Sequence, residues 1–425
     1  MLIIGNKPYI NLKLDNILDV FDENTRLNLG LPNYNNGTKI YNQYFNCHIY
    51  ENLKKKKLNI YKNSSANNTT SVNDEYIDIF IKKFDIKNYK NVFRQCNDKK
   101  KIYNSFLNNI KCPYKFNNIP RVGCNAIFDL LIKNKKVYIS NFSLIDADNG
   151  KHMYNSKNIV GNCHNIQDEM KILIWLHNNN FIDATLSNLK DTTLPFLDCS
   201  IIKSNDNVIS LLINQYGICI LENYFNDDSI NILNNEFDNI FLNYKKKVEI
   251  LDKEGASKDE RIFFAEKYSN LMKKYISDDI LFNSCAKNYK LLKNKSNINK
   301  KLLLNKLDYE DNVIKNSGAG WHRDNHNCQF KVMVYLTDVT EDNGNFQFLT
   351  NSSKKHIGFP TPRTENYNTR FKDDTIKDIL EKKNNVNLHN IIGKKGTVII
   401  VDTTYIHRGN IIKKGIRKAI TQYFF

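Results

Sequence analysis

Residues that commonly bind metal ions gather near the end of the sequence. His322 and Asp324 form a His-x-Asp pair, His407 follows an apolar run at residues 396–402, and Arg417 comes ten positions after His407. Side chains alternate along an extended chain, so His322 and Asp324 point to one face while Arg323 points away. Two imidazoles and one carboxylate make up the facial triad that holds Fe(II) and leaves positions open for a co-substrate and O₂. Open positions predict a catalytic metal centre.

Arg417 begins a stretch whose period-2 pattern predicts a final strand over residues 417–425. If Arg417 faces inward, Ala419, Thr421 and Tyr423 do so too. Small neighbours leave room for a ligand, and a guanidinium suits a carboxylate such as the far end of 2-oxoglutarate. Residues 330–336 and 396–402 predict two more strands. Short antiparallel strands around a metal suit a jelly roll.

Residues 205–425 resemble the phytanoyl-CoA dioxygenase-like branch of the Fe(II)/2-oxoglutarate oxygenases. Besides the residues above, the resemblance is carried by Asn343-Gly344-Asn345-Phe346, which is similar to the family's Asn-Gly-Pro-Phe-type turn with asparagine in place of proline. Residues 211–225 look like the family's first strand, and residues 227–237 look like its first helix.

This resemblance implies a reaction and a role for each residue. His322, Asp324 and His407 would bind iron, and Arg417 would bind 2-oxoglutarate. The reaction would be oxidative decarboxylation of 2-oxoglutarate to succinate, coupled to hydroxylation of an unactivated C–H bond. Related halogenases lack a carboxylate at the position of Asp324, so its presence favours hydroxylation.

The first two hundred residues carry a second set of candidate residues. Residues 1–7 predict a short buried strand that ends in a Gly5-Asn6 turn, where an open α/β sheet usually accepts a nucleotide. His164 is followed five positions later by Glu169, in the first turn of a helix predicted over residues 168–176. An imidazole can take a proton from an attacking hydroxyl near neutral pH. His164 could equally be a capping or surface histidine.

In their order, segments of residues 1–190 resemble the four sialylmotifs of eukaryotic-type sialyltransferases. The resemblance implies an inverting glycosyltransferase that uses a CMP-activated sugar acid and needs no metal. Asn6 and Asn28 would contact the nucleotide, His152 its phosphate, and His164 would be the general base, with Glu169 completing the last motif. The segments that carry the resemblance are Gly5-Asn6, Arg26-Leu27-Asn28, Gly37-Thr38-Lys39, residues 120–123 with a predicted helix at 126–132 and strand at 137–142, His152-Met153-Tyr154, and residues 164–169.

Two departures from these motifs leave two readings open. Lys7 replaces the serine that usually follows Gly-Asn, and Arg121-Val122 replace a Ser/Thr pair near the donor. The domain is then either an active transferase with a different donor or a nucleotide-sugar-type fold that serves binding.

Length and composition bound the remaining possibilities. A chain of 425 residues is long enough for two domains, each with its own core. Nine cysteines without a Cys-x-x-Cys predict reduced, mostly buried thiols. The net charge of +17 is spread in short clusters without a recognition motif, which argues against nucleic acid and fits anionic substrates. With no membrane-spanning stretch and no signal peptide, we expect a cytoplasmic protein.

Together these observations predict a two-domain enzyme. A Rossmann-like, glycosyltransferase-type α/β domain spans residues 1–190, a linker spans 191–207, and a dioxygenase domain spans 208–425, with a double-stranded β-helix (jelly roll) and flanking helices. The expected function is a bifunctional glycan- or sugar-modifying enzyme, with an Fe(II)- and 2-oxoglutarate-dependent hydroxylase and a CMP-sugar-dependent glycosyltransferase-like domain. Its expected partners are a small-molecule or glycan substrate and O₂. The alternative is a single-activity hydroxylase of a lipid, metabolite or protein with an inactive N-terminal binding module. A nonenzymatic interaction protein would require an empty iron site. The sequence does not predict an oligomeric state.

Overall fold

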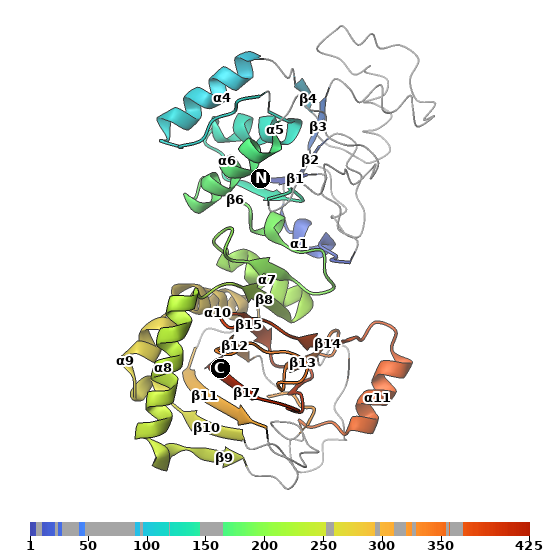
Figure 1. Ribbon diagram of the computed structural model, residues 1–425. Helices are drawn as coiled ribbons and strands as arrows, with labels where there is room; N and C mark the ends of the chain where they lie inside the picture. The colour runs from blue at the N-terminus through green and yellow to red at the C-terminus, as the bar shows by residue number, and fades with distance from the viewer. Residues whose placement is uncertain are drawn as a thin grey trace. The chain divides into compact units, whose positions relative to one another are not determined.

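The chain divides into two compact units. One comprises Met1–Thr193 and Ile201–Lys203, and the other Leu194–Ser200 and Ser204–Phe425. The segment 191–207, expected as a linker, contributes strand β7 (Phe196–Asp198) to the sheet of the second unit. The computed structural model describes residues 1–5, 11–21, 24–27, 42–46, 90–93, 97–118, 120–144, 165–251, 259–293, 298–309, 320–324, 329–353, 357 and 369–425 (Figure 1).

The first unit contains a parallel sheet of six strands in the order β4-β3-β2-β1-β5-β6. The three residues of β1 are all buried, as expected for an inner strand of a parallel sheet. Gly5 follows β1 at a close approach of two backbones, because a Cβ there would lie 2.4 Å from the carbonyl oxygen of Asn141. The strands are β1 (Leu2–Ile4), β2 (Asn24–Leu27), β3 (Asn42–Asn46), β4 (Lys90–Phe93), β5 (Val137–Ser140) and β6 (Ile182–Asp183).

Helices of the first unit pack on this sheet through one apolar cluster. Tyr103 and Leu107 of α4, Phe128 of α5 and Leu173 of α6 join Ile139 of β5 in that core. The helices predicted at 126–132 and 168–176 exist and begin earlier than expected, at Val122 and Ile166. The helical segments are α1 (Asp15–Leu18), α4 (Asn97–Asn109), α5 (Val122–Leu131), α6 (Ile166–Asn178) and the 3₁₀ turn η2 (Thr185–Asn188).

The second unit contains two sheets, in the manner of a jelly roll. The larger has the order β7-β8-β15-β12-β17-β11-β10-β9 and is antiparallel except between β7 and β8; the smaller has the order β14-β13-β16. The strands predicted at 330–336, 396–402 and 417–425 are β12, β15 and β17. The remaining bounds are β8 (Ile218–Glu222), β9 (Glu249–Leu251), β10 (Asp259–Phe263), β11 (Lys300–Asp308), β12 (Phe330–Tyr335), β13 (Phe346–Leu349), β14 (Leu388–Ile391), β15 (Val398–Asp402), β16 (His407–Gly409) and β17 (Ile416–Phe424).

Apolar residues of both sheets pack together between them. Met333, Tyr335 and Ile399 come from the larger sheet, and Phe346 and Phe348 from the smaller. In Figure 1, α8, α9 and α10 lie to one side of the larger sheet, and the smaller sheet with α11 lies to the other. The helical segments are α7 (Asp206–Tyr216), α8 (Asp227–Asn243), η3 (Lys245–Lys247), η4 (Ala265–Lys267), α9 (Asn270–Met272), the π-helical turn η5 (Lys273–Ser277), α10 (Ile280–Leu292) and α11 (Asp373–Lys382).

The prediction of a first strand at residues 211–225 is only partly correct. Residues up to Tyr216 belong to helix α7, and the strand β8 starts at Ile218. Val208, Ile209, Leu212 and Ile213 are buried at helical spacing, so the apolar run has period 3.6 and not 2. The helix predicted at 227–237 is α8.

The described cysteines agree with the prediction of reduced, mostly buried thiols. Among the described residues five cysteines are free, and four of these, Cys112, Cys124, Cys219 and Cys285, are buried. Burial raises the pKa of all four thiols, so they stay protonated and unreactive at neutral pH. In the described part of the chain no helix has the length and apolar character that crossing a bilayer requires.

Candidate metal centre

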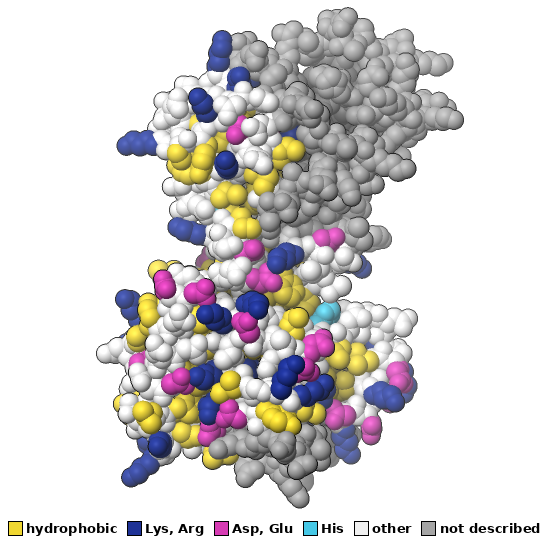
Figure 2. All heavy atoms as spheres, in the orientation of Figure 1, with side chains coloured by type: hydrophobic (Ala, Val, Ile, Leu, Met, Phe, Trp, Pro, Cys, Tyr) yellow, Lys and Arg dark blue, Asp and Glu magenta, His cyan; other side chains and the backbone are white. Residues whose placement is uncertain are grey.

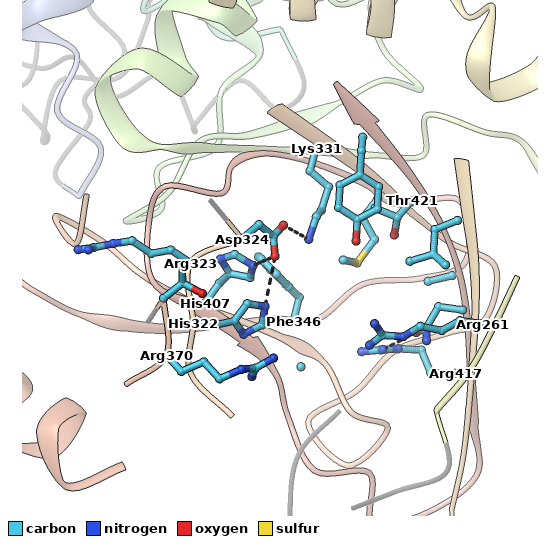
Figure 3. A pocket seen from close by; sticks show the side chains of 17 residues that line it. Arg261, His322, Arg323, Asp324, Lys331, Phe346, Arg370, His407, Arg417 and Thr421 are labelled. Atoms are coloured by element: carbon cyan, nitrogen blue, oxygen red, sulfur yellow. Dashed lines mark hydrogen bonds and ion pairs between the residues drawn. The ribbon is translucent and has the colours of Figure 1, made fainter. Parts of the chain in front are cut away.

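The structure brings His322, Asp324 and His407 together. His322 and His407 pair as an isolated antiparallel bridge, in which each backbone N–H donates to the other's carbonyl, at 3.0 and 2.9 Å. This bridge places the His-x-Asp segment beside β16. The Oδ1 atom of Asp324 lies 3.3 Å from Nε2 of His322 and 3.4 Å from Nε2 of His407 (Figure 3). One potential ligand atom from each residue lies within 4.8 Å of the other two.

Backbone carbonyls fix both imidazoles in the orientation that metal binding requires. Nδ1 of His322 lies 2.8 Å from the carbonyl oxygen of Gly320, and Nδ1 of His407 lies 2.9 Å from that of Tyr405. When each Nδ1 donates its proton there, each Nε2 presents a lone pair to Oδ1 of Asp324. Nε2 of His407 is buried and has no hydrogen-bond partner. Three electron-pair donors that face one another fit a divalent cation between them.

The protonation states also suit a metal centre. Burial lowers the pKa of His407 to about 4, so its imidazole is neutral at physiological pH. Burial alone would raise the pKa of Asp324, but the nearby Lys331 ammonium helps to hold that pKa well below its usual range. Nζ of Lys331 lies 2.6 Å from Oδ2 of Asp324. The sequence did not identify Lys331, since nothing in the local pattern around residue 331 predicts this contact.

A cavity of about 280 Å³ lies beside the three ligands. Its volume is near the lower end of the range for small-molecule sites. Met333 and Phe346 give it apolar walls, and Arg417 lines it together with Ala419, Thr421 and Tyr423, as expected for one face of a strand. The cavity can therefore hold a small ligand between the metal centre and Arg417.

Arg417 is buried and keeps part of its guanidinium available. Nη1 donates to the carbonyl oxygen of Gly344, Nη2 donates to Oδ1 of Asn305 at 2.8 Å, and Nε is buried without a hydrogen-bond partner. Burial lowers the pKa of Arg417, yet an arginine remains charged. The φ of Gly344 is +70°, and a Cβ there would lie 2.8 Å from a side-chain carbon of Leu307, so the turn requires glycine.

Arg261 is another cationic residue of the cavity that sequence reasoning missed. Its strand β10 pairs with β11, which pairs with β17, so that Arg261, Asn305 and Ala419 lie in one row across the sheet. Its guanidinium donates to both carboxylate oxygens of Asp259, at 3.1 and 2.5 Å. These contacts depend on pairing between strands far apart in the sequence, so no local signal could reveal them.

Arg323 points away from the metal centre, as expected from its place within the His-x-Asp pair. Nη2 donates to the backbone carbonyls of Ser352 and Ile357 at 2.9 and 2.8 Å. Its guanidinium lies 5.1 Å from the ring centroid of Phe371. The side chain thus ties together segments that surround the centre.

The charged surface shows no single-sign stripe on the face in view. Figure 2 shows lysines and arginines interspersed with acidic residues over the second unit. This agrees with the short basic clusters of the sequence.

Most of the site residues predicted in the first unit lie outside the described residues. This applies to Asn6, Asn28, His152 and His164. Glu169 is described and lies in the first turn of α6, as expected. It is buried, and its two oxygens accept from the backbone N–H and from Nε of Arg121, at 2.7 and 2.5 Å.

Comparisons with known proteins bear on the second unit. Residues 213–414 match the family model described as phytanoyl-CoA dioxygenase. No curated protein matches the chain. Among solved structures, the epimerase SnoN in complex with Fe³⁺, alpha ketoglutarate and nogalamycin RO is similar, with 12% identity, a TM-score of 0.42, and coverage of 52% of this chain and 83% of that one. EctD from S. alaskensis, with 2-oxoglutarate and 5-hydroxyectoine, has 17% identity, a TM-score of 0.38, and coverage of 50% and 74%.

Proposed function

We propose that the second unit is an Fe(II)- and 2-oxoglutarate-dependent dioxygenase that acts as a hydroxylase. The observation that carries this proposal is the convergence of His322, Asp324 and His407 on a cavity that also holds Arg417. The match of residues 213–414 to the phytanoyl-CoA dioxygenase family supports it.

Each residue of the centre has a definite role in this proposal. Fe(II), when bound by the two imidazoles and the carboxylate, supplies O₂ activation coupled to oxidative decarboxylation of 2-oxoglutarate. The carbonyl oxygens of Gly320 and Tyr405 keep the Nε2 atoms of His322 and His407 aimed at the metal position.

Arg417 binds the far carboxylate of 2-oxoglutarate in this proposal. Its Nε has no partner within the described structure, and a carboxylate can accept from Nε and the adjacent Nη2 as a fork. Met333 and Phe346 would give the co-substrate apolar contacts. Because Asp324 provides a carboxylate ligand, no position is left for a halide in its place, and hydroxylation is the favoured outcome.

The proposed substrate is a small molecule or a glycan, as predicted from the sequence. The alternative is a lipid, a metabolite or a protein segment. In both versions, the substrate, O₂ and 2-oxoglutarate would give the hydroxylated substrate, succinate and CO₂.

Turnover of 2-oxoglutarate tests the proposed function without knowledge of the substrate. We expect Fe(II)-dependent succinate formation by the full chain, and its loss in His322→Ala. Arg408→Gln is the matched control, because Arg408 donates to Gln347 and Asp373 and is not part of the cavity wall. Absence of succinate with folded, iron-loaded protein, or equal succinate from His322→Ala, would contradict the proposal.

Two versions of the proposal differ in the role of the first unit. In one it is a CMP-sugar-dependent glycosyltransferase, and in the other it is an inactive binding module. Glu169 bears on the choice, because its carboxylate is engaged by Arg121 and buried, out of reach of an acceptor. This contact favours the binding module. Release of CMP from a CMP-activated sugar acid by the full chain, lost in His164→Ala, would favour the transferase instead.

A further inference from the structure

The two carboxylate oxygens of Asp324 face different partners. Oδ1 lies between the Nε2 atoms of His322 and His407, while Oδ2 lies 2.6 Å from Nζ of Lys331. Figure 3 shows the Lys331 side chain reaching Asp324 from the side opposite the two imidazoles. A metal that binds the imidazoles meets Oδ1, and the ammonium occupies Oδ2.

We propose that Lys331 is a positioning residue that restricts Asp324 to binding the metal through Oδ1 alone; this inference rests on the proposed iron centre. Restriction to one oxygen matters because a carboxylate can bind a metal through one oxygen or both. With Oδ2 held by a cation, the second mode is blocked.

The location of Lys331 suits this role. It lies in the middle of the larger sheet, on β12, where its register partners are Tyr423 of β17 and Val401 of β15. The residue is 5% exposed, and Nζ lies 4.8 Å from the ring centroid of Tyr423. An ammonium that is this buried keeps its carboxylate partner, because separating the two would leave a poorly solvated charge unpaired.

The consequence concerns the number of coordination positions left for the reaction. In an octahedral centre, two imidazoles and one oxygen leave about three positions, and a carboxylate bound through both oxygens leaves about two. A chelating co-substrate takes two positions and O₂ needs one more. Lys331 therefore preserves the position that O₂ requires.

Substitutions at residue 331 separate positioning from a purely structural role. Lys331→Met keeps the length of the side chain and removes the ammonium, so Oδ2 loses its ion pair. Lys331→Arg keeps a cation, and the cavity that residue 331 lines adjoins its head group. Lys306→Met is the matched control, because Lys306 is also a strand lysine that pairs with carboxylates, those of Glu260 and Asp308, at 3.2 and 2.8 Å, and it does not line the cavity.

The test counts the water ligands of Mn(II) bound to the full chain, from the broadening of its electron paramagnetic resonance lines in ¹⁷O-enriched water. We expect about three waters in the wild type and in Lys331→Arg and Lys306→Met, and about two in Lys331→Met.

The outcomes distinguish this inference from the proposed function. Two waters in the wild type, or three in a folded Lys331→Met, would overturn the role of Lys331 and leave the metal centre intact. Equal counts in the Met and Arg variants would also overturn it. Failure of folded wild-type protein to bind Mn(II) would overturn the proposed function itself. If Lys331→Met does not fold, a count of two waters in the wild type would still overturn the inference.

Discussion

The two units treat a buried carboxylate in opposite ways. In the first unit, Glu169 accepts hydrogen bonds on both oxygens from Arg121, so the pair closes on itself. In the second, Asp324 shares one oxygen with the unprotonated Nε2 faces of His322 and His407, beside a cavity. A closed pair holds elements together, whereas converging electron-pair donors next to a cavity need a cation. Burial of a charge alone therefore does not mark a functional site.

The largest effect is expected from a substitution that removes a ligand of the metal centre. Asp324→Ala should weaken Co(II) binding by more than about 100-fold, because loss of a ligand exceeds the effect of losing an outer partner. Absorption titration of metal-free protein with Co(II) measures it. Glu169→Gln is the control and should bind Co(II) like the wild type; equal binding by Asp324→Ala would rule out the assigned centre.

Breaking the closed pair should affect stability instead. Glu169→Gln leaves Arg121 without its counter-charge, and loss of one partner of a buried ion pair costs about 3–5 kcal/mol. Because Arg121 keeps 27% of its side chain exposed, we expect the lower end of that range. Hydrogen exchange in peptides that cover α6 measures the effect. Unchanged protection of α6 would show that the pair does not hold the unit together.

Acid should destabilise the metal-free second unit through His407. The pKa of His407 is about 4 in the folded protein against 6.5 for the ordinary group. Between these pH values the unfolded chain holds a proton that the folded chain lacks, so the free energy of unfolding falls as the pH drops from 6.5 to about 4. The full loss is about 3 kcal/mol. Urea unfolding across this range should show a steeper pH dependence in the wild type than in His407→Asn; equal slopes would count against the shifted pKa.

The smallest effect on stability is expected from breaking an exposed ion pair. Lys382 and Asp378 on α11 lie 3.1 Å apart with 72% and 63% of their side chains exposed. Lys382→Ala should change the free energy of unfolding by less than about 0.5 kcal/mol, because water screens such pairs. Urea denaturation checks this value. A loss above about 1 kcal/mol would mean that surface pairs matter here as much as buried ones.

Local patterns predicted much of the second unit. Alternation along an extended chain correctly predicted that Arg323 points away from the metal centre. It also correctly predicted that Ala419, Thr421 and Tyr423 share the cavity face with Arg417. The secondary structure at the start of this unit was harder to predict, because the buried apolar run of α7 contains no helix-breaking residue before Gly217. Gly217 is the left-handed residue that ends the helix.

Contacts between distant strands could not be predicted in the same way. Lys331 meets Asp324, and Arg261 reaches the cavity through the pairing of β10, β11 and β17. Both depend on register, which one sequence does not specify residue by residue. In the first unit, Asn6, Asn28, His152 and His164 lie outside the described residues, so their roles stay predictions.

The central claim is that the three metal ligands and Arg417 serve one reaction in one cavity. Its most direct test is anaerobic titration of the full chain with Fe(II) and 2-oxoglutarate, followed by the visible charge-transfer band of the chelate. We expect a band in the wild type and in Arg408→Gln. Arg417→Gln should need a 2-oxoglutarate concentration about tenfold higher, or more, to give the same band, because a charged bidentate bond is lost. No band in folded, iron-loaded wild type, or an identical titration for Arg417→Gln, would contradict the account.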